Sequence, residues 1–212
     1  MSRRSFLSIE QRTRLFDVPT TPAEMARHYV LSLEDLLLVR AKRRSMSRLG
    51  FAVQLCPLRH PGQGLGPGQQ PPAALLDFVA AQLGTPATVF ADCARRDQTR
   101  REHAAELQAI LGLHSFRLGD WRDCLRAGAD AAWATDRGEP IVHAMLTSLR
   151  IQGVLVPDAA VLERIGLAAR ARARQRTFKA LADGSHQDRA GRTGRSARDR
   201  PCRAALPVHL AA

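Results

Sequence analysis

The sequence predicts an all-α protein built from several short helices. Hydrophobic residues make up 45% of the 212 residues but aromatic residues only 5%, and β-branched residues are few beside Ala, Leu and Arg. Ala, Leu and Arg favour helix, whereas strands are rich in β-branched and aromatic residues. A Gly/Pro-rich segment at residues 62–71 interrupts the helical pattern. We therefore expect a multi-helical fold with two helix-turn-helix-like units, a Gly/Pro-rich linker between them and a disordered C-terminal tail.

The first 44 residues predict three short helices, each announced by a capping residue. Ser8, Thr21 and Ser32 each precede an amphipathic run, and each is a residue type whose side chain accepts from the free N–H groups of a first helical turn. Pro19 ends the first helix, because proline disfavours helical geometry in the residue before it. The third helix closes on a group of cations, which suits the negative end of a helix dipole.

Residues 48–58 form the most apolar stretch of the first half. A fourth helix beginning at Ser45 or Ser47 includes this stretch. The same residues also alternate as a strand would, at Leu49, Phe51, Val53 and Leu55. So short a run satisfies both periods, and we favour helix because the segments on both sides are helical.

After the Gly/Pro segment the pattern predicts further helices, which begin near Pro72, Pro86, Asp97, Leu118, Pro140 and Pro157. Gly84 and Gly112 end two of them. The apolar residues of the helix at 118–135 fall four apart, at Trp121, Leu125, Ala129 and Trp133. We expect this stripe to face the core rather than to provide aromatic rings for base stacking.

These elements predict four parts of the chain. Residues 1–61 form an N-terminal helical unit, 62–71 the linker and 72–182 a second helical unit. Residues 183–212 lose all helical or strand periodicity and are rich in Arg and Gly, so we expect them to be disordered. The abrupt change at residue 183 suggests, as a hypothesis, that a frameshift replaced the original continuation.

The charge points to an acidic partner. The net charge is +12 and the isoelectric point about 11.2, a balance typical of nucleic-acid-binding proteins. The excess is uneven: residues 1–60 carry 11 basic and 5 acidic side chains, whereas residues 61–157 carry 9 and 10. A genome with high GC content would also enrich arginine, but it would do so along the whole chain.

Motifs for catalysis, metals and membranes are missing from the sequence. We find no nucleophile elbow, P-loop, HExxH or dinucleotide-binding pattern, the histidines are scattered, and the four cysteines form no CxxC pair. The carboxylate pairs Glu102/Glu106 and Asp120/Asp123 fit solvated helix faces. Without a signal peptide or a long apolar run, we expect a cytoplasmic, nucleoid-associated protein with no catalytic residue, metal, cofactor or small-molecule substrate.

Three groups of cations are the candidate DNA-binding residues. Phosphate contacts come from Arg and Lys and from the N–H groups of helix N-termini. The middle group lies between two predicted helices, and the other two lie at the N-terminus and at a helix start. They comprise Arg3, Arg4 and Arg12 (with Arg14 beside them); Arg40, Lys42, Arg43, Arg44 and Arg48; and Arg95, Arg96, Arg100 and Arg101. The alternative is that these cations only solvate the surface.

Several long motifs give the sequence a family resemblance. The stretch RLGFAVQL at residues 48–55, the loop of Arg59, Pro61 and Gly62, and RRDQTRREH at residues 95–103 resemble the N-terminal region of transposases of the Tn-three family, the replicative transposases of bacterial unit transposons. The resemblance runs from about Arg3 to Leu181. It implies a helical region that binds the terminal inverted repeats of the transposon.

The resemblance also implies a longer protein. The resemblance implies that family members continue into a ribonuclease-H-like domain with an Asp-Asp-Glu metal site, and we expect this domain to be absent from this chain. We therefore expect a truncated DNA-binding part of a transposase, with double-stranded terminal-repeat DNA and possibly an intact transposase as partners. The alternative is a helical protein–protein interaction module without specific DNA binding.

Overall fold

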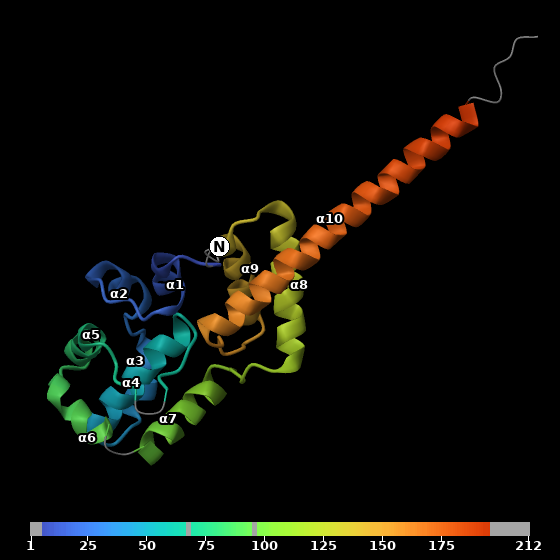
Figure 1. The fold of residues 1–212 in the computed structure, drawn as a ribbon. Coiled ribbons are helices and arrows are strands. Elements are labelled where there is room, and N and C mark those ends of the chain that lie inside the picture. Colours follow the sequence, from blue (N-terminus) through green and yellow to red (C-terminus); the bar gives the residue numbers. More distant parts are fainter. Residues whose placement is uncertain (1–5, 67–68, 95–96, 196–212) are drawn as a thin grey trace, which may run out of the picture.

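The structure is a computed structural model that describes the chain except residues 1–5, 67–68, 95–96 and 196–212; the side chains of residues 94, 97 and 183–195 are also not described. Within the described ranges the chain forms ten α-helices and one short 3-10 helix, with no β-strand. The predicted all-α class is confirmed. Figure 1 shows two groups of helices side by side, with one long helix extending away from them.

Three short helices open the fold as the capping signals predict. They are α1 (Ile9–Phe16), α2 (Pro22–His28) and α3 (Leu33–Arg40). Ser8 and Ser32 each close a capping box, in which the serine accepts from the third residue of the helix and that residue's side chain accepts from the serine N–H. The side chain of Thr21 accepts from the N–H of Glu24 at the start of α2. Each predicted cap is therefore confirmed.

Helix α4 (Ser45–Arg59) is the centre of the first group. Every residue from Leu49 to Leu58 is buried, so neither face of this segment meets solvent. The alternation that could indicate a strand arose from a mostly apolar helical segment that is buried on all sides. Helix α4 packs against α3, α5 (Ala73–Leu83), the 3-10 helix η1 (Ala87–Val89), α6 (Phe90–Ala94) and α7 (Asp97–Ile110).

The second group is a three-helix bundle. It consists of α8 (Leu118–Ala134), α9 (Gly138–Ile151) and α10 (Ala159–Arg195), with α8 packed against both others. Figure 1 shows α10, in orange, crossing α8 and then continuing beyond the bundle. The helical backbone runs through Arg195, past the predicted end of the helical unit near Leu181. The rest of the predicted tail, residues 196–212, lies outside the described residues.

Two separate clusters of buried apolar side chains correspond to these groups. One joins α2 to α7 around Phe51, and the other joins the α8–α10 bundle to Phe6, Leu7 and Phe16 at the N-terminus. The N-terminal segment with α1 therefore shares its core with the C-terminal bundle. The clusters do not coincide with the predicted units 1–61 and 72–182, because helices α5 to α7 complete the core around α4.

Phe6 shows how closely the N-terminal segment joins the bundle. A Cβ atom on Gly138 would lie 2.0 Å from the carbonyl oxygen of Phe6, and one on Gly166 would lie 2.5 Å from its ring. The two glycines thus make the space that Phe6 fills between α9 and α10. The guanidinium of Arg170 covers the ring, 4.6 Å from its centroid.

The start of the Gly/Pro segment is held against the residues that precede α10. The N–H of Val156 donates to the carbonyl of Gly62 at 2.9 Å, and the side chain of Gln63 donates to the carbonyl of Pro157 at 2.9 Å. Gly62 has a φ of +105°, and a Cβ there would lie 2.9 Å from Val156, so only glycine fits. The sequence predicts that this segment is a free tether between two binding units. That remains a prediction, and these contacts do not favour it.

The expected aromatic stripe on α8 is only half buried. Leu125 and Ala129 belong to the core, but Trp121 is 37% exposed and Trp133 is 56% exposed. The prediction that both tryptophans face the core is wrong. A spacing of four residues drifts by about 40° per step around a helix with 3.6 residues per turn, so the ends of the stripe leave the buried face.

No single helix in the described part of the chain is both long and apolar enough to cross a membrane. Helix α5 together with the segment Ala87–Cys93 passes the same length and composition test as a pair bent by 110°.

Candidate nucleic-acid interface

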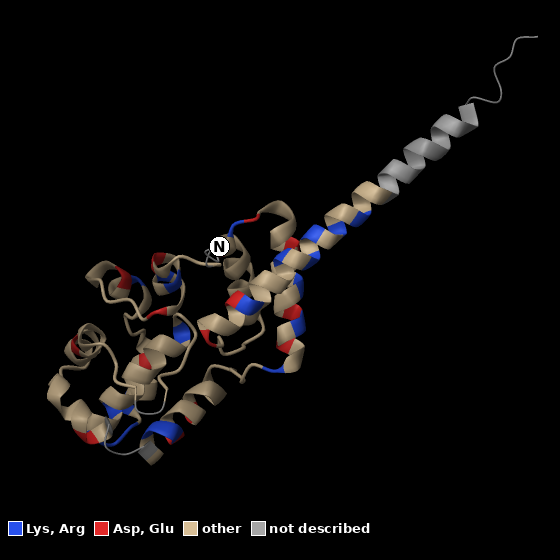
Figure 2. Cartoon of the chain, in the orientation of Figure 1, with Lys and Arg blue, Asp and Glu red and all other residues tan. Residues whose placement is uncertain are grey.

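The turn between α3 and α4 is the centre of the candidate interface. We call residues 40–48 the basic turn, because it carries the predicted cations Arg40, Lys42, Arg43, Arg44 and Arg48. Helix α3 ends at Arg40, and the N–H of Lys42 still bonds back to the carbonyl of Val39 at 3.1 Å. Arg44 is extended, with φ −105° and ψ 145°, and Ser45 begins α4. The turn therefore reverses the chain within four residues and concentrates cations at one end of the first group (Figure 2).

Arg48 fixes the shape of the basic turn. Its Nε donates to the carbonyl of Lys42 at 2.8 Å, and its Nη2 donates to the carbonyl of Arg40 at 3.4 Å. These carbonyls follow the end of α3, where no further helical N–H is available to them. The guanidinium of Arg48 is thus used within the protein, although the sequence placed it among DNA-binding residues.

Lys42 is also engaged. Its ammonium forms an ion pair with Glu106 on α7 and lies over the ring of Phe51, 4.4 Å from the centroid. Only 18% of the Lys42 side chain is exposed, against 45% of Glu106. Lys42 therefore ties the basic turn to α7, and its charge is partly compensated before any partner arrives.

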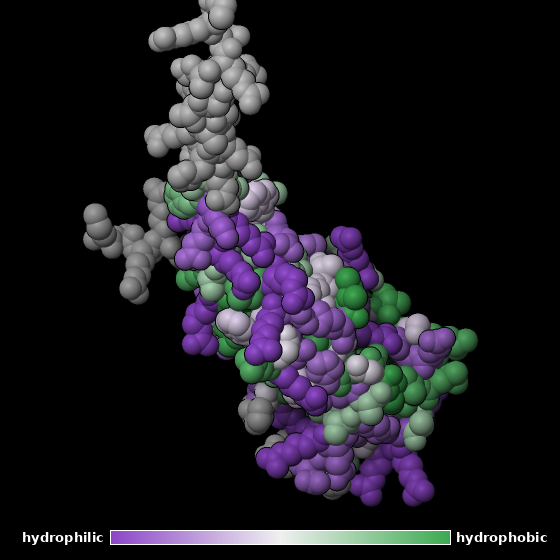
Figure 3. Space-filling model, turned by 90° about the vertical axis from the view of Figure 1, so that its right-hand side faces the viewer, coloured by the Kyte–Doolittle hydropathy of each residue, from purple (hydrophilic) through white to green (hydrophobic). Residues whose placement is uncertain are grey.

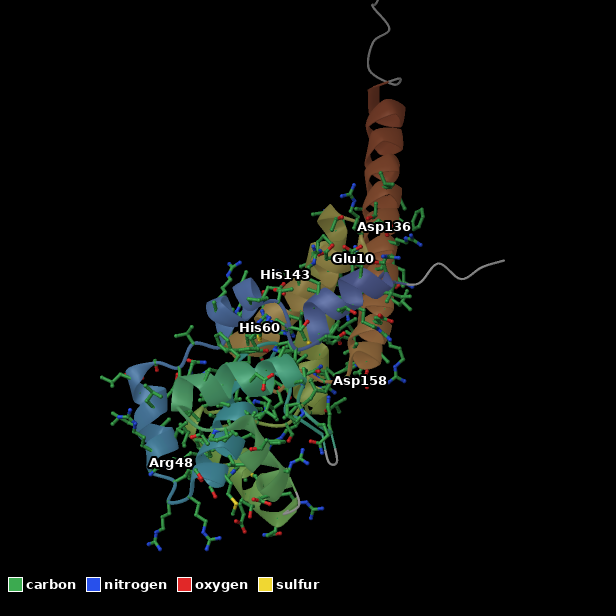
Figure 4. All side chains as sticks on the ribbon, turned by 90° about the vertical axis from the view of Figure 1, so that its left-hand side faces the viewer. Glu10, Arg48, His60, Asp136, His143 and Asp158 are labelled. Carbon is green, nitrogen blue, oxygen red and sulfur yellow. The ribbon has the colours of Figure 1, made fainter. Side chains whose placement is uncertain are left out.

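Arg43 and Arg44 are the available cations of the turn. Both are exposed, and neither side chain has a hydrogen bond or ion pair within the described part of the chain. Figure 4 shows long side chains extending outwards from this turn, beside the labelled Arg48. Arg40 is likewise exposed. Three cations on a fixed turn are thus free to meet an anionic partner.

A small pocket lies between the basic turn and α7. Its volume is about 250 Å³, and it is lined by Lys42, Arg43, Arg44, Met46, Ser47, Cys93, Thr99 and His103. We call it the α4 pocket, because the first turn of α4 forms one wall. No side chain caps this helix start. Its N–H groups thus keep the capacity to bind an anion.

His103 forms the wall of the pocket on α7. It is 6% exposed, and its ring meets that of Phe51 edge to face at 5.4 Å. Its Nδ1 is buried and has no hydrogen-bond partner among the described residues. Burial lowers the pKa of His103, and the charge of Lys42 lowers it further, so the imidazole is neutral near pH 7.

The other predicted DNA-binding residues are not gathered at this turn. Arg12 forms an ion pair with Glu163 of α10 at 3.1 Å. Arg100 donates to the carbonyl of Gln69 at 2.9 Å and so holds the Gly/Pro segment. Arg101 is exposed, but it lies two residues from both Thr99 and His103, which places it on the other face of α7. Arg3, Arg4, Arg95 and Arg96 lie outside the described residues.

A second basic surface, which the predicted set did not include, lies between α8 and α10. A groove of about 530 Å³ is lined by Trp121, Arg122, Leu125, Arg126, Asp130, Arg172 and Arg176. Arg176 pairs with Asp130 at 3.0 Å and Arg126 with Asp123 at 2.8 Å, whereas Arg122 and Arg172 have no such partner among the described residues. Figure 3 shows hydrophilic side chains over this side of the molecule. The sequence signal for this surface is the run of alternating arginines at residues 170–176 in the last helix.

The carboxylate pairs are engaged within the protein. Glu106 pairs with Lys42, and Glu102 accepts from the side chain of Gln98 at 2.9 Å. Asp120 accepts a hydrogen bond from the N–H of Arg117 at 2.6 Å, and this bond is one half of the capping box at the start of α8. Among the described residues, no three His, Cys, Asp or Glu side chains form a group that could hold a metal ion.

The geometry thus defines an all-α protein with an exposed basic turn that the side chain of Arg48 braces. In a comparison with known protein families, residues 6–169 match a family described as a domain of unknown function, DUF4158. The chain belongs to that family. The matched range includes α1 to α9 and the first part of α10, so it covers both core clusters.

Curated relatives of the chain are transposases. It is 39% identical over 183 residues to the transposase for transposon Tn3926 of Escherichia coli, and 38% identical to those for Tn21 of E. coli and Tn501 of Pseudomonas aeruginosa. Each alignment covers 86% of this chain but 18% of the relative. The chain thus spans less than a fifth of the length of these relatives. The similarity supports the predicted resemblance to Tn-three-family transposases.

Proposed function

We propose that this chain is a DNA-binding part of a transposase, and that it recognises double-stranded DNA at the terminal inverted repeats of a transposon. The similarity to transposases supports an action on DNA. The observation that carries the proposal is the basic turn, where Arg43 and Arg44 are exposed and have no partner among the described residues, on a turn that Arg48 holds. The chain's charge of +12 supports the same conclusion.

The braced turn suits contacts to the DNA backbone. Phosphate contacts fix the position of a protein on a duplex, and each displaces condensed counterions. Because Arg48 already holds the turn, binding need not order its backbone, which would otherwise cost about 1–2 kcal/mol per residue. Arg40, Arg43 and Arg44 are the residues we propose for phosphate contact. We propose no catalytic step for this region.

The test is a binding titration of the purified chain with a fluorescent duplex. Duplexes with the terminal repeats of Tn3926, Tn21 and Tn501 are compared with a scrambled duplex at several salt concentrations. We expect the repeats to bind more tightly than the scrambled duplex, with affinity falling as salt rises. Equal affinity for all duplexes would remove the claim of specific recognition.

A double variant localises the contact. Arg43→Ala/Arg44→Ala should weaken binding and reduce the slope of log affinity against log salt by about 2, since each lost phosphate contact removes about 0.9. Arg137→Ala/Arg164→Ala is the matched control, because both residues are exposed and the variant loses the same charge elsewhere. An equal loss of slope in both variants would show that only net charge matters.

The alternative is a helical module that binds another protein, such as an intact transposase. The exposed apolar side chains Trp133, Phe178 and Leu181 on α8 and α10 favour it, with exposed fractions of 56%, 71% and 66%. Association with a full-length transposase that persists at high salt, together with no duplex binding at low salt, would support this function over DNA recognition.

A further inference from the structure

We propose that the α4 pocket is a seat for one phosphate group, and that in the proposed DNA complex a backbone phosphate occupies it. The pocket shares Lys42, Arg43 and Arg44 with the basic turn, but α4, α6 and α7 also contribute to its walls. The DNA part of this inference rests on the proposed function, whereas the affinity for phosphate does not.

The start of α4 supplies the first element of the seat. A helix N-terminus presents free N–H groups and a partial positive charge, and both favour an anion. Helix α4 has 15 residues, and its cap residue, Arg44, makes no side-chain capping bond. α1, α2 and α3 all carry side-chain caps at their N-termini, so an anion at α4 would compete with no capping group.

His103 supplies an independent observation. Its Nδ1 is buried and has no hydrogen-bond partner among the described residues, and His103 lines the pocket together with Cys93. Leaving a buried polar atom without a hydrogen-bond partner carries a free-energy cost. An anion in the pocket would allow the imidazole to bind a proton and donate a hydrogen bond, which removes that cost.

The rest of the lining is suited to phosphate. The hydroxyls of Ser47 and Thr99 can donate, and Lys42, Arg43 and Arg44 bring positive charge to the same pocket. The opposing groups are Glu102 and Glu106, whose charges act on His103 from its own helix. Glu106 is already paired with Lys42, so the net field of the lining favours an anion. A volume of about 250 Å³ admits one phosphate group but no nucleobase stack.

Inorganic phosphate is the first probe. Phosphate is titrated into the whole chain, and the imidazole resonances of His103 are monitored in a two-dimensional NMR spectrum. These resonances are assigned by their absence from the spectrum of His103→Gln. We expect saturable shifts of the His103 resonances, and an affinity about tenfold lower in Ser47→Ala/Thr99→Val. The matched control Thr147→Val/Ser148→Ala removes two hydroxyls from α9 and should bind as the parent does. Unchanged His103 resonances, or equal phosphate affinities in all variants, would refute the proposal that the α4 pocket binds phosphate.

The second arm distinguishes the source of the phosphate. Single neutral methylphosphonates are placed in turn along a terminal-repeat duplex. If a DNA phosphate occupies the pocket, a methylphosphonate at one position should weaken binding of the parent about tenfold. The same methylphosphonate should weaken binding of Ser47→Ala/Thr99→Val very little, because that variant has already lost the contact. If the chain binds inorganic phosphate but no methylphosphonate position has this effect, the pocket binds free phosphate, and the proposal that it binds a DNA phosphate is refuted. Absence of duplex binding, with His103 still responding to phosphate, would instead refute the proposed function alone.

Discussion

The Nε of Arg48 donates to the carbonyl oxygen of Lys42 at 2.8 Å, across the turn that joins α3 to α4. A side chain predicted to contact DNA thus holds the backbone that presents its neighbours. The bond links the first turn of α4 to the end of α3, so the position of Arg43 and Arg44 depends on a residue that itself faces inward. The charge of Arg43 and Arg44 and the ordering of the turn by Arg48 are therefore two separate contributions to DNA binding.

Replacement of Arg48 should separate these contributions. Arg48→Ala removes the bonds to the carbonyls of Lys42 and Arg40, which should lower the free energy of unfolding by about 1–2 kcal/mol. Duplex affinity should fall because the turn loses order, whereas the salt slope should change less than in Arg43→Ala/Arg44→Ala. Urea unfolding and salt-dependent duplex titration give both values. Arg48→Lys keeps the charge, and full recovery in that variant would show that charge alone matters.

Gly50 should tolerate no side chain. A Cβ there would lie 2.2 Å from the sulfur of Cys93, inside the packed interface between α4 and α6. We expect Gly50→Ala to destabilise the protein by about 1–3 kcal/mol, as overpacking of a core does. Gly119→Ala is the control, since Gly119 lies in helix α8 with nothing within 4 Å and alanine favours helix. Thermal unfolding of both variants measures the difference; equal midpoints would contradict the packing around Gly50.

The buried carboxylate of Asp35 should make the protein sensitive to acid. Burial alone would raise the pKa of Asp35, but hydrogen bonds from Arg59 and Ser32 outweigh it and lower the pKa below its ordinary value. A lowered pKa means that the unfolded state binds the proton first, so this stability is complete above about pH 4 and is lost as pH falls further. Asp35→Asn should lose about 2 kcal/mol at pH 7 and show a weaker acid dependence below pH 4. Urea titrations from pH 7 to pH 3 provide the measurement.

A second pH effect should come from His60. Its ring stacks on that of His28 at 3.9 Å, and burial, followed by the charge of His28, lowers the pKa of His60 to about 4. In the unfolded chain the group titrates near pH 6.5. Stability should therefore be unaffected above about pH 7 and should fall as pH decreases from about 6.5 to 4, because only the unfolded state then binds the proton.

The variant His60→Gln isolates this window. It should lose less stability than the parent between pH 7 and pH 4.5, while both should respond alike to the titration of Asp35 at lower pH. Denaturant midpoints at four or five pH values separate the two effects. Identical curves for parent and variant across the upper window would rule out His60 as the group responsible.

Phe6 should stabilise the C-terminal bundle although it lies at the other end of the sequence. Its side chain is 8% exposed and fills the space left by Gly138 and Gly166. Phe6→Ala should lower the free energy of unfolding by about 3–5 kcal/mol, the usual cost of a phenylalanine cavity. Ile9→Ala is the control, because Ile9 is 88% exposed. A small effect of Phe6→Ala would show that the Phe6 side chain does not belong to this core.

Local signals in the sequence determined the elements themselves. Ser8, Thr21 and Ser32 cap helices where predicted, and Gly84 ends α5 with a φ of +60°. These features depend on bonds between residues three or four apart, so the sequence contains both partners. The basic turn was equally predictable, since it follows from a helix that ends in cations before the next helix starts.

The tertiary structure alone decided which cations are available and which helices share a core. Arg12 and Glu163 are 151 residues apart, Lys42 and Glu106 are 64 apart, and no local pattern pairs them. The same holds for Phe6 between α9 and α10, for the groove between α8 and α10, and for His103 beside the start of α4. Helical periodicity specifies the face on which a residue lies, but the partner of that face is chosen by packing between distant segments. The sequence by itself therefore determined an all-α chain with a basic turn. Long-range packing decided that Arg12, Lys42, Arg48 and Arg100 are held within the protein, while Arg43 and Arg44 have no partner in the part of the chain that the structure describes.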